Sequence, residues 1–123
     1  MIWNPEKECM DKVARERLQF ARLKNLVEHV YNVVRFYKQK LDDAGVKLSD
    51  ITCLADIAKL PFTTKSDLRD TYPYGLLAVP QAEIVEIHMS SGKTGTPVVD
   101  AYTESDLNDW AEAMARSVYA STT

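Results

Sequence analysis

The chain has 123 residues, of which 46% are apolar and 27% are charged, and its 15 basic and 18 acidic residues leave a net charge of -3 at pH 7. This length suits one domain or part of one, and the apolar share excludes the composition of a disordered chain. The acidic balance argues against electrostatic attraction to nucleic acid or to an anionic membrane, so any anion must be bound locally. No stretch approaches the roughly 20 apolar residues that a membrane-spanning helix needs.

The cysteine content and the first residues indicate a reducing compartment. Cys9 and Cys53 are the two cysteines, and they form no C-x-x-C motif. Residues 1–10 lack the basic start and apolar centre of a signal peptide. We therefore expect a cytoplasmic protein. Neither cysteine has the histidine and acid setting of a nucleophile in the sequence around it, so we expect no catalytic role for either one.

Residues 11–34 have the pattern of a long amphipathic helix. Asp11 precedes the pattern as an N-cap residue, and the face opposite the apolar one carries mixed charges, which is typical of a solvated surface. The apolar residues recur at spacings of three and four along one face: Phe20, Leu23, Val27, Val30 and Val34. A second helix is predicted over residues 36–45 and ends at Gly45, where glycine can take the left-handed conformation that closes a helix.

The middle of the chain is predicted to be largely irregular, with one short helix. Thr64 and Asp67 have the hydroxyl-x-x-acid spacing of a capping box, which predicts a helix as far as about Thr71. Residues 71–80, TYPYGLLAVP, contain two prolines that cannot continue a helix. The aromatic and leucine residues of this segment indicate that it packs on the rest of the chain.

The pattern changes at Glu83. Residues 83–89 and 98–102 are rich in β-branched residues and predict two short strands, and Thr103 with Asp106 repeats the capping-box spacing at the start of a last helix. The apolar face of that helix consists of Leu107, Trp110, Ala111, Met114, Ala115 and Val118. Because an isolated hairpin is marginal in water, this part is predicted to be the edge of something larger or half of an oligomer.

The sequence between the two strands, SSGKTGTP, has the composition of a phosphate-binding loop. Phosphate groups are held by backbone N–H groups, by hydroxyls that turn to donate, and by the mobile charge of lysine. The loop offers all three in Ser90, Ser91, Gly92, Lys93, Thr94, Gly95 and Thr96. It matches neither the Walker A pattern nor the dinucleotide pattern G-x-G-x-x-G. From composition alone, a flexible hairpin loop without a ligand is an equally good interpretation.

Several separate segments resemble one family in the same order along the chain. The loop resembles the Ser-Ser-Gly-Thr-Thr-Gly-Lys-Pro phosphate loop of acyl-adenylate-forming enzymes. IWNPE near the start, LPFTTKSDLRDTYPYGLLAVP in the middle and YT before the last helix resemble the N-terminal segment of phenylacetate-coenzyme A ligases. The resemblance covers essentially the whole chain. Two loop positions depart from the family pattern: Lys93 stands where the family has its first threonine, and Thr96 stands where it has lysine.

This resemblance implies a fold, a reaction and a set of ligands. The fold implied is α+β: a mostly helical region over residues 1–82, then a hairpin around the phosphate loop and an amphipathic helix over residues 83–123, all as the N-terminal portion of a larger α/β adenylating domain. The reaction implied is AMP-forming ligation of an aryl acid, phenylacetate, to coenzyme A, with ATP and Mg²⁺. Family enzymes are far longer, so this chain alone is predicted to be inactive, with no complete catalytic set.

Two alternatives remain open beside this interpretation. The chain could be a non-catalytic helical module that pairs through exposed apolar helix faces, such as that of Trp110 and Met114, with another copy or with the rest of a ligase. It could also be a small phosphate-binding regulator without turnover. His88, directly before the loop, is expected to have a structural role more often than a ligand role, because a lone histidine at a strand end usually has one.

Overall fold

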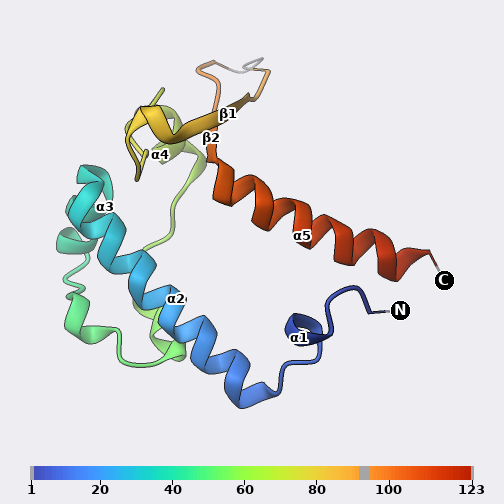
Figure 1. The fold of residues 1–123 in the computed structure, drawn as a ribbon. Helices are drawn as coiled ribbons and strands as arrows, with labels where there is room; N and C mark the ends of the chain where they lie inside the picture. Colours follow the sequence, from blue (N-terminus) through green and yellow to red (C-terminus); the bar gives the residue numbers. More distant parts are fainter. Residues whose placement is uncertain (1, 92–94, 123) are drawn as a thin grey trace.

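The structure of the chain, a computed structural model, describes residues 2–91 and 95–122. Helices form most of the first two thirds, and a two-stranded antiparallel sheet and a long final helix follow (Figure 1). This arrangement confirms the predicted α+β class, while the division of the chain at residue 82 stays a prediction. Within the described ranges, no helix is both long enough and apolar enough to cross a bilayer.

Helix α2 (Lys12–Val33) is the long helix that the apolar spacing predicted. The Asp11 carboxylate accepts hydrogen bonds from the N–H groups of Val13 at 2.9 Å and Ala14 at 3.0 Å, which confirms the N-cap. A short helix, α1 (Pro5–Glu8), precedes it and was not predicted, because four residues are too few to show a helical period. Proline at its first position costs no hydrogen bond there.

Helix α3 (Arg35–Asp43) follows α2 after a single extended residue, Val34, with φ of -107° and ψ of 104°. The helix therefore starts one residue before the predicted position. Gly45 closes it with a φ of +68°, in the left-handed region, as the sequence predicted. The Val46 N–H then donates to the Leu41 carbonyl at 3.0 Å, which satisfies a carbonyl of the last turn.

The core of the molecule lies between α2, α3 and the segment after α3. Val27, Leu41 and Ile51 are buried there and form one cluster. Partly buried apolar residues surround it: Phe20, Leu23, Tyr31, Val46, Leu48 and Leu60. Three of these nine residues, Phe20, Leu23 and Val27, belong to the α2 face predicted from spacing, so the amphipathic pattern located this part of the core correctly.

Two 3-10 helices, η1 (Leu48–Asp50) and η2 (Leu54–Lys59), follow α3, and the second is organised by a buried carboxylate. Asp56 accepts from the N–H groups of Thr52 at 2.7 Å and Cys53 at 2.9 Å, and it pairs with Lys59 at 2.8 Å. These partners, Lys59 first, hold the pKa of Asp56 well below its usual range. The carboxylate thus fixes the turn that leads into the core.

Helix α4 (Lys65–Asp70) begins with the predicted capping box. The Thr64 N–H donates to the Asp67 carboxylate at 2.7 Å, and the Asp67 N–H donates to the Thr64 hydroxyl at 3.3 Å. Lys40 of α3 forms an ion pair with the same carboxylate, so the cap also joins α4 to the helical core. Residues 71–80 form turns without regular structure, as predicted, and η3 (Gln81–Glu83) leads into the sheet.

The sheet consists of β1 (Ile84–Met89) and β2 (Val99–Thr103). Both strands agree with the sequence to within one residue at each end. Their register places Met89 opposite Val99 and His88 opposite Asp100. Helix α5 (Glu104–Ser121) starts directly at the end of β2, because Thr103 is both the last strand residue and the N-cap of the helix.

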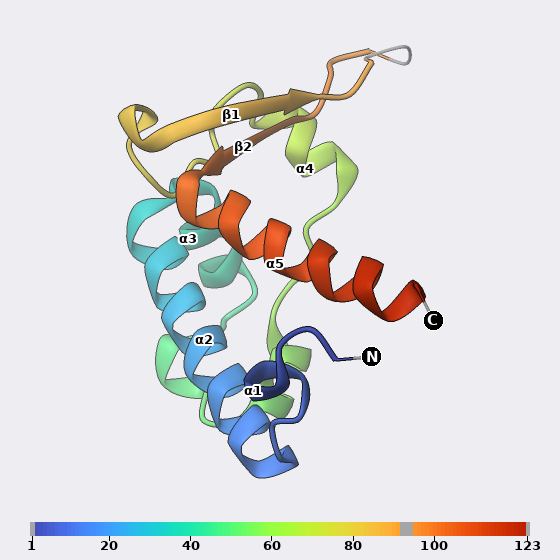
Figure 2. The ribbon, with the colours of Figure 1, turned by 45° about the vertical axis from the view of Figure 1, so that its right-hand side comes forward.

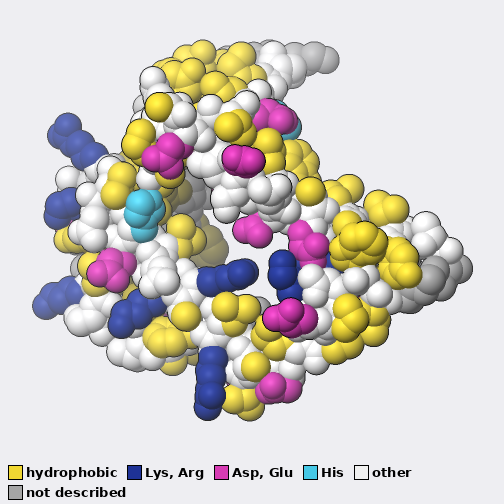
Figure 3. Space-filling model, viewed as in Figure 1, with side chains coloured by type: hydrophobic (Ala, Val, Ile, Leu, Met, Phe, Trp, Pro, Cys, Tyr) yellow, Lys and Arg dark blue, Asp and Glu magenta, His cyan; other side chains and the backbone are white. Residues whose placement is uncertain are grey.

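In space, the hairpin lies above the helical part, and α5 runs from it toward the N-terminal segment (Figures 1 and 2). Helices α2 and α5 diverge around a cleft of about 370 Å³ between them. Charged side chains surround the opening seen in Figure 3. Those lining the cleft are Lys7, Arg15, Arg22, Asp109 and Arg116.

Candidate functional site

The predicted phosphate loop is the connection between β1 and β2, and Ser90 closes its base. The Ser90 N–H donates to the Val98 carbonyl at 3.0 Å, and the Val98 N–H donates to the Ser90 hydroxyl oxygen at 2.9 Å. A hydroxyl that accepts one hydrogen bond retains its own O–H as a donor. The side chain therefore fixes the width of the loop and still has a proton to offer to an anion.

The other described loop residues lie at the two ends of the connection. Ser91, Gly95 and Thr96 are exposed to solvent. Gly95 has a φ of +126°, a conformation that L side chains rarely adopt, and an added Cβ there would meet nothing within 4 Å. The glycine is thus needed for the backbone conformation rather than for space. Gly92, Lys93 and Thr94, the other three predicted site residues, lie outside the described residues.

An aromatic cluster supports the hairpin just before the loop. The His88 ring lies 5.2 Å from the Tyr102 ring and 5.7 Å from the Trp110 ring, measured between centroids, and Tyr102 and Trp110 are 5.6 Å apart. His88 also bonds through Nε2 to the Glu86 carboxylate. These contacts join β1, β2 and α5, so they support a structural role for His88 two residues before Ser90.

The junction of β2 and α5 is fixed by the second capping box. The Asp106 carboxylate accepts from the Thr103 N–H and from its hydroxyl, both at 2.8 Å. The Asp106 N–H donates in return to the Thr103 hydroxyl at 3.2 Å. Because strand and helix share this residue, the box ties the direction of α5 to the hairpin that carries the loop.

The middle of α5 is held by the N-terminal segment through one carboxylate, that of Glu112. Asn4 donates to it at 2.8 Å and the Trp3 indole at 3.3 Å, while Lys7 lies 3.8 Å away. The Asn4 hydrogen bond is the main cause of the lowered pKa of Glu112. Glu112 also pairs with Arg116 at 3.6 Å. The sequence around Glu112 does not indicate this role, since a glutamate on a helix gives no local signal of a partner 108 residues away.

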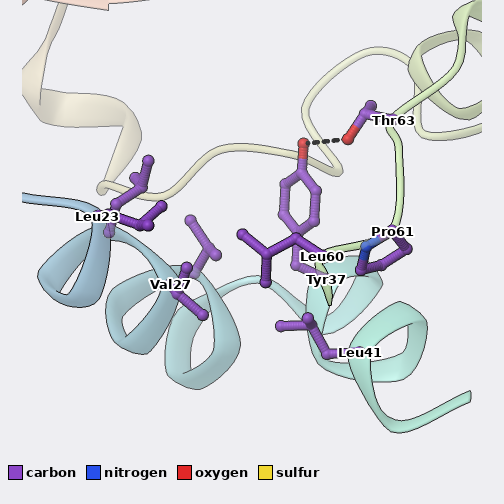
Figure 4. Close-up of a pocket in the computed structure, with 9 residues that line it drawn as sticks. Leu23, Val27, Tyr37, Leu41, Leu60, Pro61 and Thr63 are labelled. Carbon is purple, nitrogen blue, oxygen red and sulfur yellow. Dashed lines mark hydrogen bonds between the residues drawn. The ribbon is translucent and has the colours of Figure 1, made fainter. Parts of the chain in front are cut away.

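A different hollow lies on the helical part of the molecule. It has a volume of about 270 Å³ and is bordered by α2, α3 and the chain from Leu60 to Thr63 (Figure 4). Its walls are leucine and valine side chains, and the Tyr37 hydroxyl meets the Thr63 hydroxyl at 3.2 Å across its edge. With so few polar groups, it suits an apolar group rather than a phosphate.

The remaining candidates give no reactive site within the described part of the chain. Cys9 and Cys53 are free and exposed, and the Cys53 N–H donates a hydrogen bond to the Asp56 carboxylate. Among residues 2–91 and 95–122, no three histidine, cysteine, aspartate or glutamate side chains gather closely enough to hold a metal ion. The loop at the end of the hairpin therefore remains the best candidate site.

Comparison with known proteins places this geometry among ligases, although no protein-family model matches the chain. It is 50% identical over 115 residues to the phenylacetate-coenzyme A ligase of Pseudomonas putida, a match that spans 94% of this chain and 26% of the relative. It is 48% identical over 120 residues to the enzyme of the same name from Thermus thermophilus, a match that spans 98% of this chain and 27% of the relative. The chain therefore spans about a quarter of the length of these relatives.

Solved structures agree with this assignment. A 2-hydroxyisobutyryl-CoA ligase in complex with 2-HIB-AMP and CoA matches with a TM-score of 0.83 and 30% identity, over 94% of this chain and 25% of the ligase. The same ligase in its postadenylation state, in complex with 2-HIB-AMP, matches with a TM-score of 0.81 and 28% identity over the same shares. The chain therefore has the sequence and the fold of an N-terminal segment of a phenylacetate-coenzyme A ligase, within the acyl-adenylate-forming enzymes.

Proposed function

We propose that this chain supplies the ATP-phosphate loop of an AMP-forming aryl-acid coenzyme A ligase, with phenylacetate as the acid. One observation carries the proposal: residues 90–96 connect a closed hairpin in a fold shared with ligases solved with an acyl-AMP and CoA. The loop composition supports it independently, because hydroxyls, glycines and one lysine suit a phosphate.

The reaction proposed for the complete enzyme has two steps. A carboxylate oxygen of the acid attacks the α-phosphorus of ATP, which gives the acyl-adenylate and releases pyrophosphate. The coenzyme A thiol sulfur then attacks the acyl carbon, a thioester forms, and AMP leaves. In the first step a protein mainly positions the reactants and offsets the charge on the phosphate oxygens, which is the work of a polar loop.

Within the loop we assign separate tasks to the residues. Ser90 closes the base and donates its remaining proton, and Ser91 and Thr94 donate hydroxyls. Gly92 and Gly95 let the backbone N–H groups approach the phosphates, and the positive φ of Gly95 supports this task. Lys93 supplies positive charge, and Thr96 offers a hydroxyl where the family has lysine. These tasks follow from composition and from the hairpin geometry around the loop.

The proposed reaction also needs Mg²⁺, the acid and coenzyme A. Mg²⁺ is proposed to arrive bound to ATP, because this ion is usually held by substrate phosphates together with one or two carboxylates. The acid pocket and the coenzyme A site are proposed to need parts of a ligase that this chain does not span, so the chain alone is inactive. The cytoplasm is the proposed location, and free, exposed Cys9 and Cys53 suit a reducing compartment.

Calorimetric titration of the chain with MgATP tests the loop directly. We expect binding by the unchanged chain, and at least tenfold weaker binding by the variant with Lys93→Ala and Thr94→Ala, because hydrogen bonds to charged groups contribute about 1.5–3 kcal/mol. The matched control is Lys65→Ala with Ser66→Ala, which removes an exposed lysine and an exposed hydroxyl from α4. Equal binding by all three forms would contradict the assignment of the loop.

A chimera distinguishes a loop that does not bind phosphate from one that binds it only within a complete enzyme. This chain replaces the matching 120 residues of the Thermus thermophilus relative, to which it is 48% identical. We expect phenylacetate-dependent release of pyrophosphate by the chimera, and a strong decrease on Lys93→Ala but not on Lys65→Ala. A folded chimera whose adenylation ignores the loop substitutions would reject the proposal, whatever the isolated chain does with ATP.

A further inference from the structure

Burial is distributed unevenly along this chain. Val27, Val34, Leu41 and Ile51 have between 2% and 6% of their surface exposed, and Asp56 is the last buried residue in chain order. Among the described residues from 57 onward, through α4, the hairpin and α5, none is buried. This part of the molecule has regular secondary structure without a core of its own.

Six of the exposed apolar residues of this part are regularly spaced on α5 and β1. On α5, Trp110, Met114 and Val118 are spaced by four and are 46%, 52% and 54% exposed; we call them the α5 stripe. Residues spaced by four lie on one face of a helix. Apolar side chains accumulate over the hairpin and along α5 in the space-filling view (Figure 3).

Strand β1 shows the corresponding strand period. Ile87 and Met89 alternate along its regular part, and Val85 lies at a shift in register between Ile84 and Glu86. The three are 48%, 60% and 59% exposed, and we call them the β1 stripe. Alternate residues of a strand share a face, so Ile87 and Met89 lie on the face opposite His88. Periodic apolar faces of this kind are typical of a protein interior, and soluble proteins rarely leave large ones exposed.

We infer that the α5 stripe and the β1 stripe form the interface with the remaining polypeptide of a phenylacetate-coenzyme A ligase. The inference rests on the matched fold and not on the loop. Solved ligases match this chain with TM-scores of 0.81 to 0.83 while it spans 25% of their length. A segment of three times this length is therefore available in those proteins to cover what is exposed here.

A second copy of this chain fits the two stripes less well than the rest of a ligase, because the stripes face in different directions. The α5 stripe begins at Trp110, whose ring meets His88 edge-on and Tyr102 at a tilt. Ile87 and Met89 lie on the other face of the strand. A two-fold dimer buries one patch against its own copy and would leave the other stripe in water. One larger partner can pack on both faces of the hairpin at once.

Co-expression with the complementary three quarters of the Thermus thermophilus relative tests the interface. We expect the affinity-tagged chain to carry the complement through purification in a one-to-one complex. Met114→Glu and Ile87→Glu should each weaken the complex at least tenfold, because each buries a charge at the contact. The control is Val13→Glu on α2, since Val13 is 56% exposed and belongs to neither stripe. It should leave the complex unchanged.

Hydrogen exchange gives a second measurement that does not depend on a soluble complement. The isolated chain is compared with the chimera described above, in which the complement is covalently present. We expect amides of α5 and β1 to exchange at least tenfold more slowly in the chimera, whereas amides at the centre of α2, already packed on the core, change little. Equal exchange of α5 and β1 in both proteins would overturn the inference.

The remaining outcomes also decide the question. The folded wild-type chain could instead form a dimer that Met114→Glu abolishes and that the complement does not displace. That result would assign the α5 stripe to a second copy and overturn the inference. Association that resists both stripe substitutions would overturn it as well. None of these measurements uses nucleotide, so the interface and the loop are tested separately. A complex that forms without ATP binding would support the interface and reject the phosphate loop. ATP binding without a complex would support the loop and reject the interface.

Discussion

The helical region before residue 57 and the hairpin with α5 are held together in different ways. In the first, Val27, Leu41 and Ile51 are buried in one cluster, and partly buried side chains surround them. In the second, the contacts are specific but at most partly buried: a three-ring cluster, a capping box at Thr103 and the hydrogen bonds to Glu112. The first region has a buried core, whereas the second is held by hydrogen bonds and ring contacts without one.

This difference shows that regular structure and independent stability need not coincide. Helix α5 is capped at its start, and the two strands pair with one shift in register between Ile84 and Glu86. Most helical stability in proteins, however, comes from packing of an apolar face. Exposed ion pairs contribute little by comparison. The hairpin region is therefore held by local hydrogen bonds and ring contacts, and our inference assigns its missing burial to contacts with the rest of a ligase.

The largest expected effect comes from the core itself. Leu41→Ala should lower the free energy of unfolding by about 2–5 kcal/mol, because the leucine is 5% exposed in a packed cluster. Met114→Ala on α5 should change it by no more than about 0.5 kcal/mol, because Met114 is 52% exposed. Urea denaturation followed by circular dichroism measures both. Similar losses for the two variants would remove the contrast between the regions.

A smaller effect, with a characteristic pH dependence, is expected from Asp56. Its pKa is lowered from the ordinary 3.8 by Lys59 and by the amides of Thr52 and Cys53. A lowered folded-state pKa means that the carboxylate stabilises the fold fully well above pH 3.8, and that this contribution disappears as the pH falls through the folded-state value.

Asp56→Asn should therefore lower the urea midpoint at pH 7 and flatten its decline below about pH 4. Measuring the midpoint from pH 7 to pH 2.5 for both proteins gives the difference between the two curves. The control is Asp109→Asn, an exposed aspartate on α5. If Asp56→Asn and Asp109→Asn give the same curve, the carboxylate does not organise η2.

Local signals in the sequence predicted the elements of both regions well. The period of α2, the glycine at position 45 and the capping boxes at Thr64 and Thr103 each depend on residues within a few positions of one another. Helix α1 and the 3-10 helices were missed because a single turn has no period to detect. The α2–α3 core followed from the apolar face, since that face needs a partner surface.

Contacts between distant segments could not be predicted in this way. Nothing near Glu112 indicates that Trp3 and Asn4 will bond to it, and nothing near Lys40 indicates its pairing with Asp67. At the loop, composition suggested a phosphate site, but the closing role of the Ser90 side chain depends on Val98 across the hairpin. Resemblance to the ligases placed these segments in one fold but predicted none of these contacts.

The smallest effect tests how the loop-bearing hairpin depends on α5. Thr103→Ala removes the side chain of a capping box and should cost about 1 kcal/mol. Because Thr103 ends β2 and caps α5, the loss should appear as faster hydrogen exchange in both the first turn of α5 and the amides of β1 and β2. Thr64→Ala removes the equivalent cap of α4, which lies outside the hairpin, and should leave the exchange of β1 and β2 unchanged. If both variants affect the hairpin equally, the strand and the helix are coupled through the whole fold rather than through their shared residue, and the hairpin region is less separate from the core than its lack of buried residues indicates.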